Sequence, residues 1–145
     1  MKKLIYLFLG LLIVACSSDN GGGGNDNLAI GQSYQGGKIF YIDSTGQHGL
    51  IAASEDHNGY LNWNDAMSYC ADYTVGQYND WFLPSKYELN LLYENKNAIG
   101  GFGGGYYWSS TESDNGYAWR QYFASGNQTS SNKDLTTNVR AVRAF

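Results

Sequence analysis

Residues 80–93 read Asp-Trp-Phe-Leu-Pro-Ser-Lys-Tyr-Glu-Leu-Asn-Leu-Leu-Tyr. Ser85 and Glu88 stand at the spacing of a capping box, in which each side chain accepts a hydrogen bond from the backbone N–H of the other residue. Apolar residues then recur at the spacing of one helix face: Leu89, Leu92 and Tyr93. The stretch therefore predicts a helix over residues 86–95, which ends before Gly100.

A β-hairpin and a shorter helix are predicted upstream of this stretch. Residues 38–42 and 49–53 are short β-prone runs, and the segment between them is rich in the Asp, Ser and Gly residues that favour turns. Residues 64–71 have apolar side chains at helical spacing, so they predict a first helix, capped by Asn64 or Asp65.

After the second helix the chain becomes β-prone again. Residues 106–109, 117–123 and 138–145 are rich in aromatic and branched side chains, and loops of Gly, Asn and Ser separate them. A hairpin, two helices and then several strands indicate an α+β fold with an antiparallel sheet. Residues 28–145 match the usual size of one domain, about 100–200 residues.

The N-terminal residues predict an export signal and a lipid anchor. Met1-Lys-Lys precedes twelve uncharged residues, a pattern typical of a signal peptide over residues 1–15. Residues 13–16 (Ile-Val-Ala-Cys) resemble the lipobox of bacterial lipoproteins, which implies that Cys16 is lipidated and attaches the chain to a membrane. Residues 16–27 would then form a Gly-rich tether. Because Cys16 is followed by Ser rather than Asp, we expect delivery to the outer membrane, on its periplasmic or cell-surface side.

Charge and cysteine content exclude several classes of function. Two of the nine Lys and Arg lie in the predicted signal, whereas all thirteen Asp and Glu lie after Cys16. Such an acidic domain lacks the clustered cations that bind nucleic acid or densely sulfated chains. Lipidation of Cys16 would leave Cys70 as the only thiol, so we expect no intramolecular disulfide and interpret Cys70 as a small buried hydrophobe.

Six sequence blocks, in the same order, resemble the Lcl C-terminal domain family. They are residues 36–41, 46–50, 80–84, 88–93, 107–112 and 139–143. The family takes its name from a bacterial collagen-like adhesin, and its function is not established. The resemblance implies a C-type-lectin-like fold, distantly related to formylglycine-generating enzymes, with two short helices packed on a small hairpin-rich sheet. In this chain Phe82 replaces the usual Arg, so apolar packing should replace any ion pair there, and Trp81 and Leu83 should be buried.

Residues suited to catalysis or metal binding are few. Formylglycine-generating relatives need a pair of active-site cysteines, which this domain lacks, so we expect no enzyme activity. His48 and His57 have no partner at zinc spacing. The oxygen-rich runs 55–58 and 112–115 have ligands that suit calcium, although such runs are more often solvated loops.

Aromatic residues suggest a binding function. Thirteen Tyr and four Trp are present, and Tyr106, Tyr107, Tyr117 and Tyr122 lie among Ser, Gly and Asn, a mixture typical of binding surfaces. By resemblance, a ligand would bind the irregular segment 100–121. The candidate ligand-binding residues are Trp108, Glu112, Asp114, Asn115, Trp119 and Arg120.

Two interpretations of this segment stay open. In the first, the domain is a non-enzymatic, adhesin-like module that binds a neutral glycan, a glycan bridged by calcium, or a protein. In the second, Trp108 and Trp119 belong to the core and Glu112 pairs with Arg120. The domain could then be a structural or homo-oligomerisation module of an envelope complex.

Overall fold

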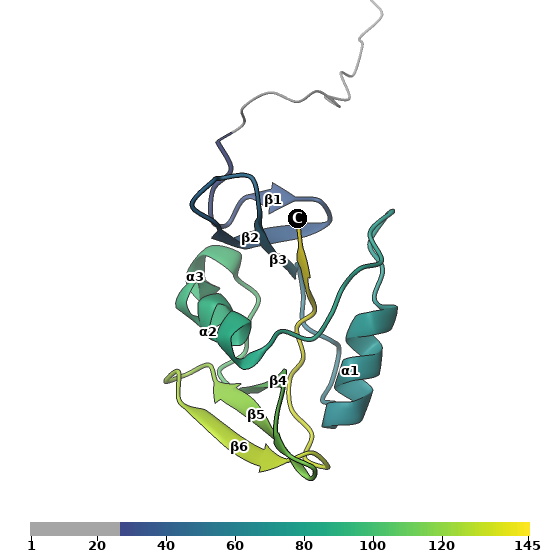
Figure 1. Ribbon diagram of the computed structural model, residues 1–145. Coiled ribbons are helices and arrows are strands. Elements are labelled where there is room, and N and C mark those ends of the chain that lie inside the picture. The colour runs from purple at the N-terminus through teal and green to yellow at the C-terminus, as the bar shows by residue number, and fades with distance from the viewer. Residues whose placement is uncertain (1–26) are drawn as a thin grey trace, which may run out of the picture.

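The computed structural model describes residues 27–145. The predicted signal peptide, Cys16 and all but the last residue of the predicted tether lie outside the described residues. Ten elements follow one another along the chain (Figure 1). They are β1 (Ser33–Tyr34), β2 (Gly37–Ile42), β3 (Gly49–Ala53), α1 (Trp63–Asp72), α2 (Lys86–Glu94), α3 (Lys96–Ile99), β4 (Tyr106–Asp114), β5 (Tyr117–Tyr122), β6 (Gln128–Asn132) and β7 (Val142–Ala144).

The first sheet has the strand order β1-β2-β3-β7 and is antiparallel throughout. The predicted hairpin is confirmed, because β2 pairs with β3 from Gly37 opposite Ala53 to Ile42 opposite Gly49. The predicted C-terminal strand over residues 138–145 is too long. Only β7 pairs with β3, and the residues before it turn away to contact the second sheet, where Asn138 bridges Tyr107.

The second sheet has the order β4-β5-β6 and is also antiparallel. Strand β4 continues to Asp114, five residues beyond the predicted end at Ser109. The sequence did not predict β6, because its residues Gln-Thr-Ser-Ser-Asn are all polar and lack apolar alternation. Together the elements confirm an α+β fold with antiparallel sheets.

Both predicted helices form, and the four-residue helix α3 was not predicted. Helix α2 has the full capping box, in which Glu88 N–H donates to Ser85 Oγ at 3.2 Å and Ser85 N–H donates to Glu88 Oε2 at 2.7 Å. The predicted cap of α1 is wrong. Its cap is Asn62, whose side chain accepts from the Asp65 N–H, so Asn64 and Asp65 lie inside the first turn.

Two apolar clusters form the core. Trp81, Leu83 and Cys70 are buried in the first cluster, as predicted, and burial raises the pKa of the Cys70 thiol to about 12. Phe82 is partly buried against the second cluster, so apolar packing does occupy the position of the usual Arg. Among residues 27–145, no helix has both the length and the apolar character needed to cross a membrane.

Replacing Ser85 by Ala should destabilise the domain by about 0.5–2 kcal/mol, because it removes the side chain that caps α2. Chemical denaturation measures this loss. Tyr87→Ala serves as the control, since the Tyr87 side chain is 70% exposed and its loss should leave the free energy of unfolding nearly unchanged. A larger loss for Tyr87→Ala than for Ser85→Ala would show that the start of the helix is assigned wrongly.

Candidate functional site

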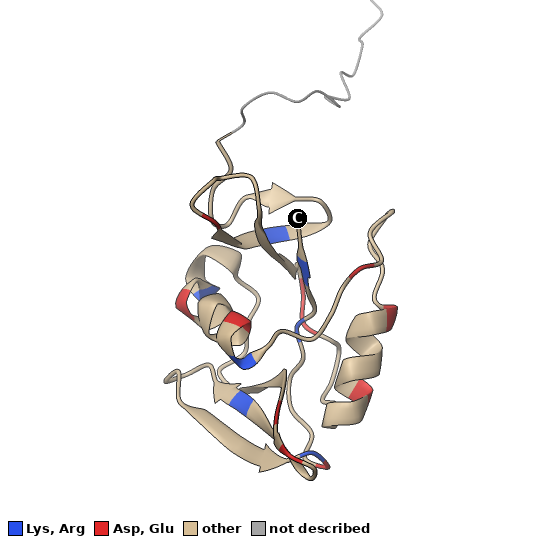
Figure 2. Ribbon diagram, in the orientation of Figure 1, with Lys and Arg blue, Asp and Glu red and all other residues tan. Residues whose placement is uncertain are grey.

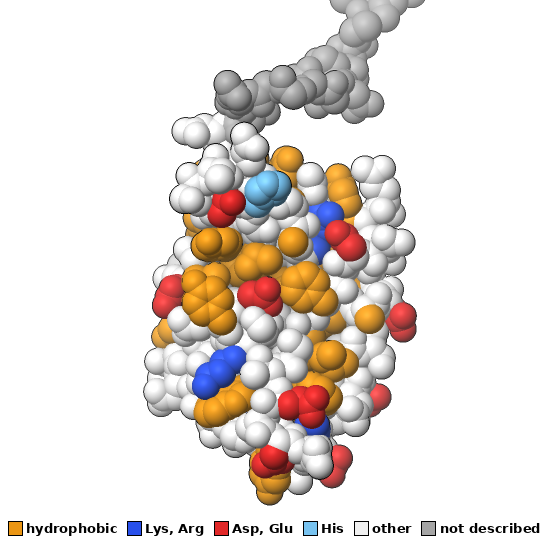
Figure 3. Space-filling view, in the orientation of Figure 1, with side chains coloured by type: hydrophobic (Ala, Val, Ile, Leu, Met, Phe, Trp, Pro, Cys, Tyr) orange, Lys and Arg blue, Asp and Glu red, His pale blue; other side chains and the backbone are white. Residues whose placement is uncertain are grey.

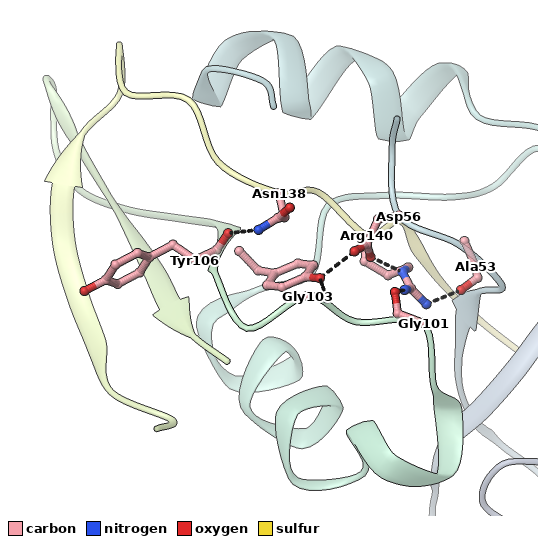
Figure 4. A network of polar contacts seen from close by, with 8 residues as sticks. Ala53, Asp56, Gly101, Gly103, Tyr106, Asn138 and Arg140 are labelled. Atoms are coloured by element: carbon pink, nitrogen blue, oxygen red, sulfur yellow. Dashed lines mark hydrogen bonds and ion pairs between the residues drawn. The ribbon is translucent and has the colours of Figure 1, made fainter. Parts of the chain in front are cut away.

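A largely buried polar network links the two sheets, with Tyr106 and Asn138 beside it (Figure 4). Arg140, which has no exposed side-chain surface, donates from Nε to Asp56 Oδ1 at 2.5 Å. Its Nη atoms donate to the carbonyls of Ala53 and Gly101 at 2.9 and 2.8 Å. The hydroxyl of Tyr107 donates to the second oxygen of Asp56. The guanidinium and the carboxylate are therefore satisfied by each other and by their neighbours.

This network anchors the glycine-rich loop over residues 100–105. The Gly101 carbonyl accepts from Arg140, and the Gly103 N–H donates to the Tyr107 hydroxyl at 2.8 Å. Phe102 packs against the Arg140 guanidinium, whose central carbon lies 4.0 Å from the centroid of the Phe102 ring. Burial, together with Asp56, raises the pKa of Tyr107, which keeps its hydroxyl protonated as a donor. Three consecutive residues of the loop, Gly101, Phe102 and Gly103, are therefore held by contacts with Arg140 and Tyr107.

A groove of about 250 Å³ lies beside this loop. Its walls come from four separate parts of the chain: the loop before α1, the glycine-rich loop, strands β4 and β5, and the segment that precedes β7. The lining residues are Tyr60, Gly103, Gly104, Gly105, Tyr106, Arg120, Thr136, Thr137 and Asn138. Aromatic rings, amide and hydroxyl groups and one cation thus meet in a single depression.

Arg120 is the charged group of this groove. Its guanidinium lies 4.0 Å from the ring centroid of Tyr106, a cation–π contact. The Nε atom of Arg120 is buried and has no hydrogen-bond partner among the described residues. Because Nε is buried, a ligand in the groove would accept from the Nη groups of Arg120.

Tyrosine rings extend the groove across the sheet surface. Tyr106 and Tyr122 lie opposite each other on β4 and β5, with ring centroids 4.8 Å apart. Tyr60 lines the groove and is 68% exposed. Asn138 holds the wall in place, since its side-chain N–H donates to the Tyr106 carbonyl at 2.9 Å. Flat apolar rings beside fixed polar atoms are suited to stacking on a sugar face and bonding its hydroxyls.

The sequence model of the Lcl C-terminal domain family matches residues 25–143. The chain belongs to this family. Among solved structures, the crystal structure of botrocetin is similar to this Lcl C-terminal domain at 12% sequence identity and a TM-score of 0.45, over 79% of this chain and 95% of botrocetin. None of the curated proteins compared with the chain matches it.

In this Lcl C-terminal domain only one of the six predicted ligand-binding residues, Arg120, lines the groove. Trp108 is fully buried in the first core cluster, and its Nε1–H donates to the Leu61 carbonyl. Trp119 lies on the face of β5 opposite to Arg120, and Lys86 Nζ is 3.2 Å from the centroid of its ring. The sheet therefore separates Trp119 from Arg120, whereas Trp108 is beside Arg120 but covered by the core.

The predicted acidic part of the site lies at the end of the β4–β5 hairpin. Glu112 pairs with Lys133, and not with Arg120 as one interpretation expected, because the register places Glu112 opposite Ala118. Asp114 accepts from the Gly116 N–H within the turn. The carbonyl of Asn115 accepts from Lys133 at 2.9 Å. These exposed residues thus stabilise the hairpin end and lie outside the lining of the groove.

The structure also corrects the expected shape of the binding segment. Residues 106–114 and 117–122 are regular strands, so only residues 100–105 of the predicted segment 100–121 are irregular. Asp56, from one oxygen-rich run considered for calcium, is already bonded to Arg140 and Tyr107. In residues 27–145 no group of three or more His, Cys, Asp and Glu side chains is placed to hold a metal ion.

Several groove residues were not identified from the sequence. Tyr60 stands in a polar loop, and Thr137 and Asn138 are separated from it by more than seventy positions. The Leu61–Thr137 bridge brings these two segments together. The one feature of the sequence that could have indicated Tyr60 was its position in a polar loop, where its ring is expected to be exposed. Many loops of this chain are equally polar.

Proposed function

We propose that this domain is a non-enzymatic binding module that recognises a glycan in the groove lined by Tyr106 and Arg120. The observation that carries the proposal is the Arg120 guanidinium, which lines the groove beside the Tyr106 ring and has no ion-pair partner among the described residues. Stacking rings with a few oriented donors and acceptors are the chemistry that sugar recognition requires.

We further propose that the domain is displayed by a lipid anchor on Cys16, as part of an outer-membrane lipoprotein. The arrangement of the described residues supports this. The chain enters the fold at the end formed by β1 and β2, whereas the β4–β5–β6 sheet lies at the opposite end (Figure 1). A tether attached at the first end would therefore hold the tyrosine-bearing sheet away from the membrane.

One observation favours the alternative of an assembly module. Strand β6 is the edge of its sheet, and its five residues include no charged side chain and no proline. Proteins usually protect such edges with charge or proline, so an unprotected edge can pair with a strand of a second copy. Light scattering distinguishes the alternatives, because a stable oligomer that binds no glycan would support assembly.

The glycan proposal predicts that the purified chain gives sugar-specific signals on a glycan array and that Tyr60→Ala lowers them severalfold. Stacking of an exposed ring contributes to binding and little to stability, so the melting temperature should stay nearly the same. Tyr87→Ala is a matched control, because Tyr87 is equally exposed and lies outside the groove. Equal losses for both variants, or array signals from neither the wild type nor the variants, would contradict the proposal.

The anchor proposal predicts that Cys16→Ala moves the protein from the membrane fraction to the soluble fraction. A single acyl chain holds a protein weakly whereas two or three hold it firmly, at about 0.8 kcal/mol for each buried CH₂. Detergent phase partitioning of cell extracts measures the change. A Cys16→Ala protein that still partitions with the detergent would place the anchor elsewhere.

A further inference from the structure

We infer that the sugar bound at Arg120 carries a carboxylate, as a uronic acid does. The inference rests on the proposed glycan-binding function and names the chemical class of the ligand. The net negative charge of the domain led us to expect a neutral glycan. A bound sugar, however, would face the positive charge of Arg120, which is closer to it than the other charges of the domain.

The three arginines of the chain differ in whether they have a carboxylate partner. Arg140 is paired with Asp56, and Arg143 donates from Nε and Nη2 to the two oxygens of Asp80 at 2.7 and 3.0 Å. Within residues 27–145, none of the ion pairs includes Arg120. The chain therefore supplies a carboxylate to two of its guanidinium groups and leaves the third, which lines the groove, for a carboxylate from outside.

The position of Arg120 suits that role. The Tyr106 ring lies 4.0 Å away on one side, and the Trp108 ring lies 6.0 Å away, so aromatic rings restrict the guanidinium. A planar guanidinium held in this way presents a fork of N–H donors that matches the two oxygens of a carboxylate. The Nε atom is buried, so the two Nη groups would supply this fork.

The neighbouring groups suit the remainder of a sugar. Asn138 already uses its side-chain N–H on the Tyr106 carbonyl, which leaves its Oδ1 to accept from a sugar hydroxyl. The exposed Tyr60 ring lines the same groove.

Charge density argues for isolated carboxylates over a densely sulfated chain. Arg120 is the only cationic side chain that lines the groove, and the other side chains there are tyrosines, threonines and an asparagine. Acidic residues are scattered over the fold, including the far end of β4 (Figure 2), and on the face drawn in Figure 3 acidic side chains lie among hydrophobic ones with few cations. Polysulfated chains require clustered cations, whereas one carboxylate requires a single fork.

The test compares matched pairs of oligosaccharides on an array. Each uronic-acid oligosaccharide is printed in its native form and in its carboxyl-reduced form, in which the carboxylate has become a hydroxymethyl group. We expect the full-length protein to bind at least one native form tenfold or more tightly than its reduced partner. Arg120→Gln should remove that preference, and Arg120→Lys, which keeps the charge but not the fork, should restore only part of it.

Lys86→Gln is the control for loss of a cation, because Lys86 lies over Trp119 on the other face of β5 and should not affect the preference. Equal binding of native and reduced forms by the wild type would overturn the inference and leave the glycan proposal intact. Loss of the preference in Lys86→Gln as well would also overturn it. Binding of neither form, in a folded protein, would overturn the inference, and absence of signal from every other glycan on the array would overturn the glycan proposal as well.

Discussion

Asp56→Ala should destabilise the domain by about 3–5 kcal/mol, the largest effect that we expect from a change outside the apolar core. The substitution leaves the Arg140 guanidinium, which has no exposed side-chain surface, without its counter-charge. It also removes the acceptor of the Tyr107 hydroxyl, which in turn holds Gly103. Since small domains have a total stability of about 5–15 kcal/mol, much of the folded state would be lost. Urea denaturation measures the change.

Asp80→Ala provides the matched comparison, because Asp80 also pairs with an arginine, Arg143, but its side chain is 56% exposed. Its hydrogen bonds with Arg143 lower the pKa of Asp80. Because Asp80 is exposed but Arg143 is only 8% exposed, we expect a loss above the roughly 0–1 kcal/mol of a fully exposed pair and below that of Asp56→Ala. Similar losses for the two aspartates would mean that burial of Arg140 does not determine the energetics of this network.

Trp108→Ala should lower the free energy of unfolding by about 3–5 kcal/mol, as is usual when a fully buried aromatic ring is removed. The substitution creates a cavity in the first core cluster and leaves the Leu61 carbonyl without the donor that Trp108 supplies. Calorimetry or urea denaturation measures the loss. A Trp108→Ala protein that keeps its stability but loses glycan binding would identify Trp108 as a ligand contact and contradict its assignment to the core.

Glu112→Gln and Asp114→Asn provide the comparison for Trp108, because all three residues were predicted to bind a ligand. Both carboxylates are exposed, and the ion pair of Glu112 with Lys133 is a surface pair. Each substitution should therefore change the stability by less than about 1 kcal/mol. It should also leave glycan binding in the groove unchanged, whereas a severalfold loss would move the site toward the hairpin end.

Features that depend on neighbouring residues were predicted well from the sequence. The capping box joins residues three positions apart, and the hairpin joins strands separated by one turn. The cap of α1 was missed because Asn62, Asn64 and Asp65 all have capping side chains within four positions. Strand β6 was missed because a polar edge strand has no hydrophobic pattern to reveal it.

The candidate site was predicted only in part, because it depends on which face of the sheet each residue occupies. Trp108, Trp119 and Arg120 are close in the sequence and similar in their suitability for binding. Adjacent strand residues point to opposite faces, so Trp119 and Arg120 cannot share a site. The register of β4 with β5 places Trp108 beside Arg120 on the same face, but core residues cover the Trp108 ring completely.

By itself, the sequence determined the α+β class, the hairpin, helix α2 with its cap, and the family, because these follow from short-range spacing and from blocks of residues in a given order. Only the tertiary structure decided which polar groups meet. Arg140 and Asp56 pair across 84 positions, and the groove joins residues near 60, 105, 120 and 137. Such contacts depend on how the two sheets pack against each other. The spacing of residues along the sequence does not indicate how distant segments pack. The same packing decided that Arg140 and Arg143 find carboxylates and that Arg120 is left beside a tyrosine in a groove.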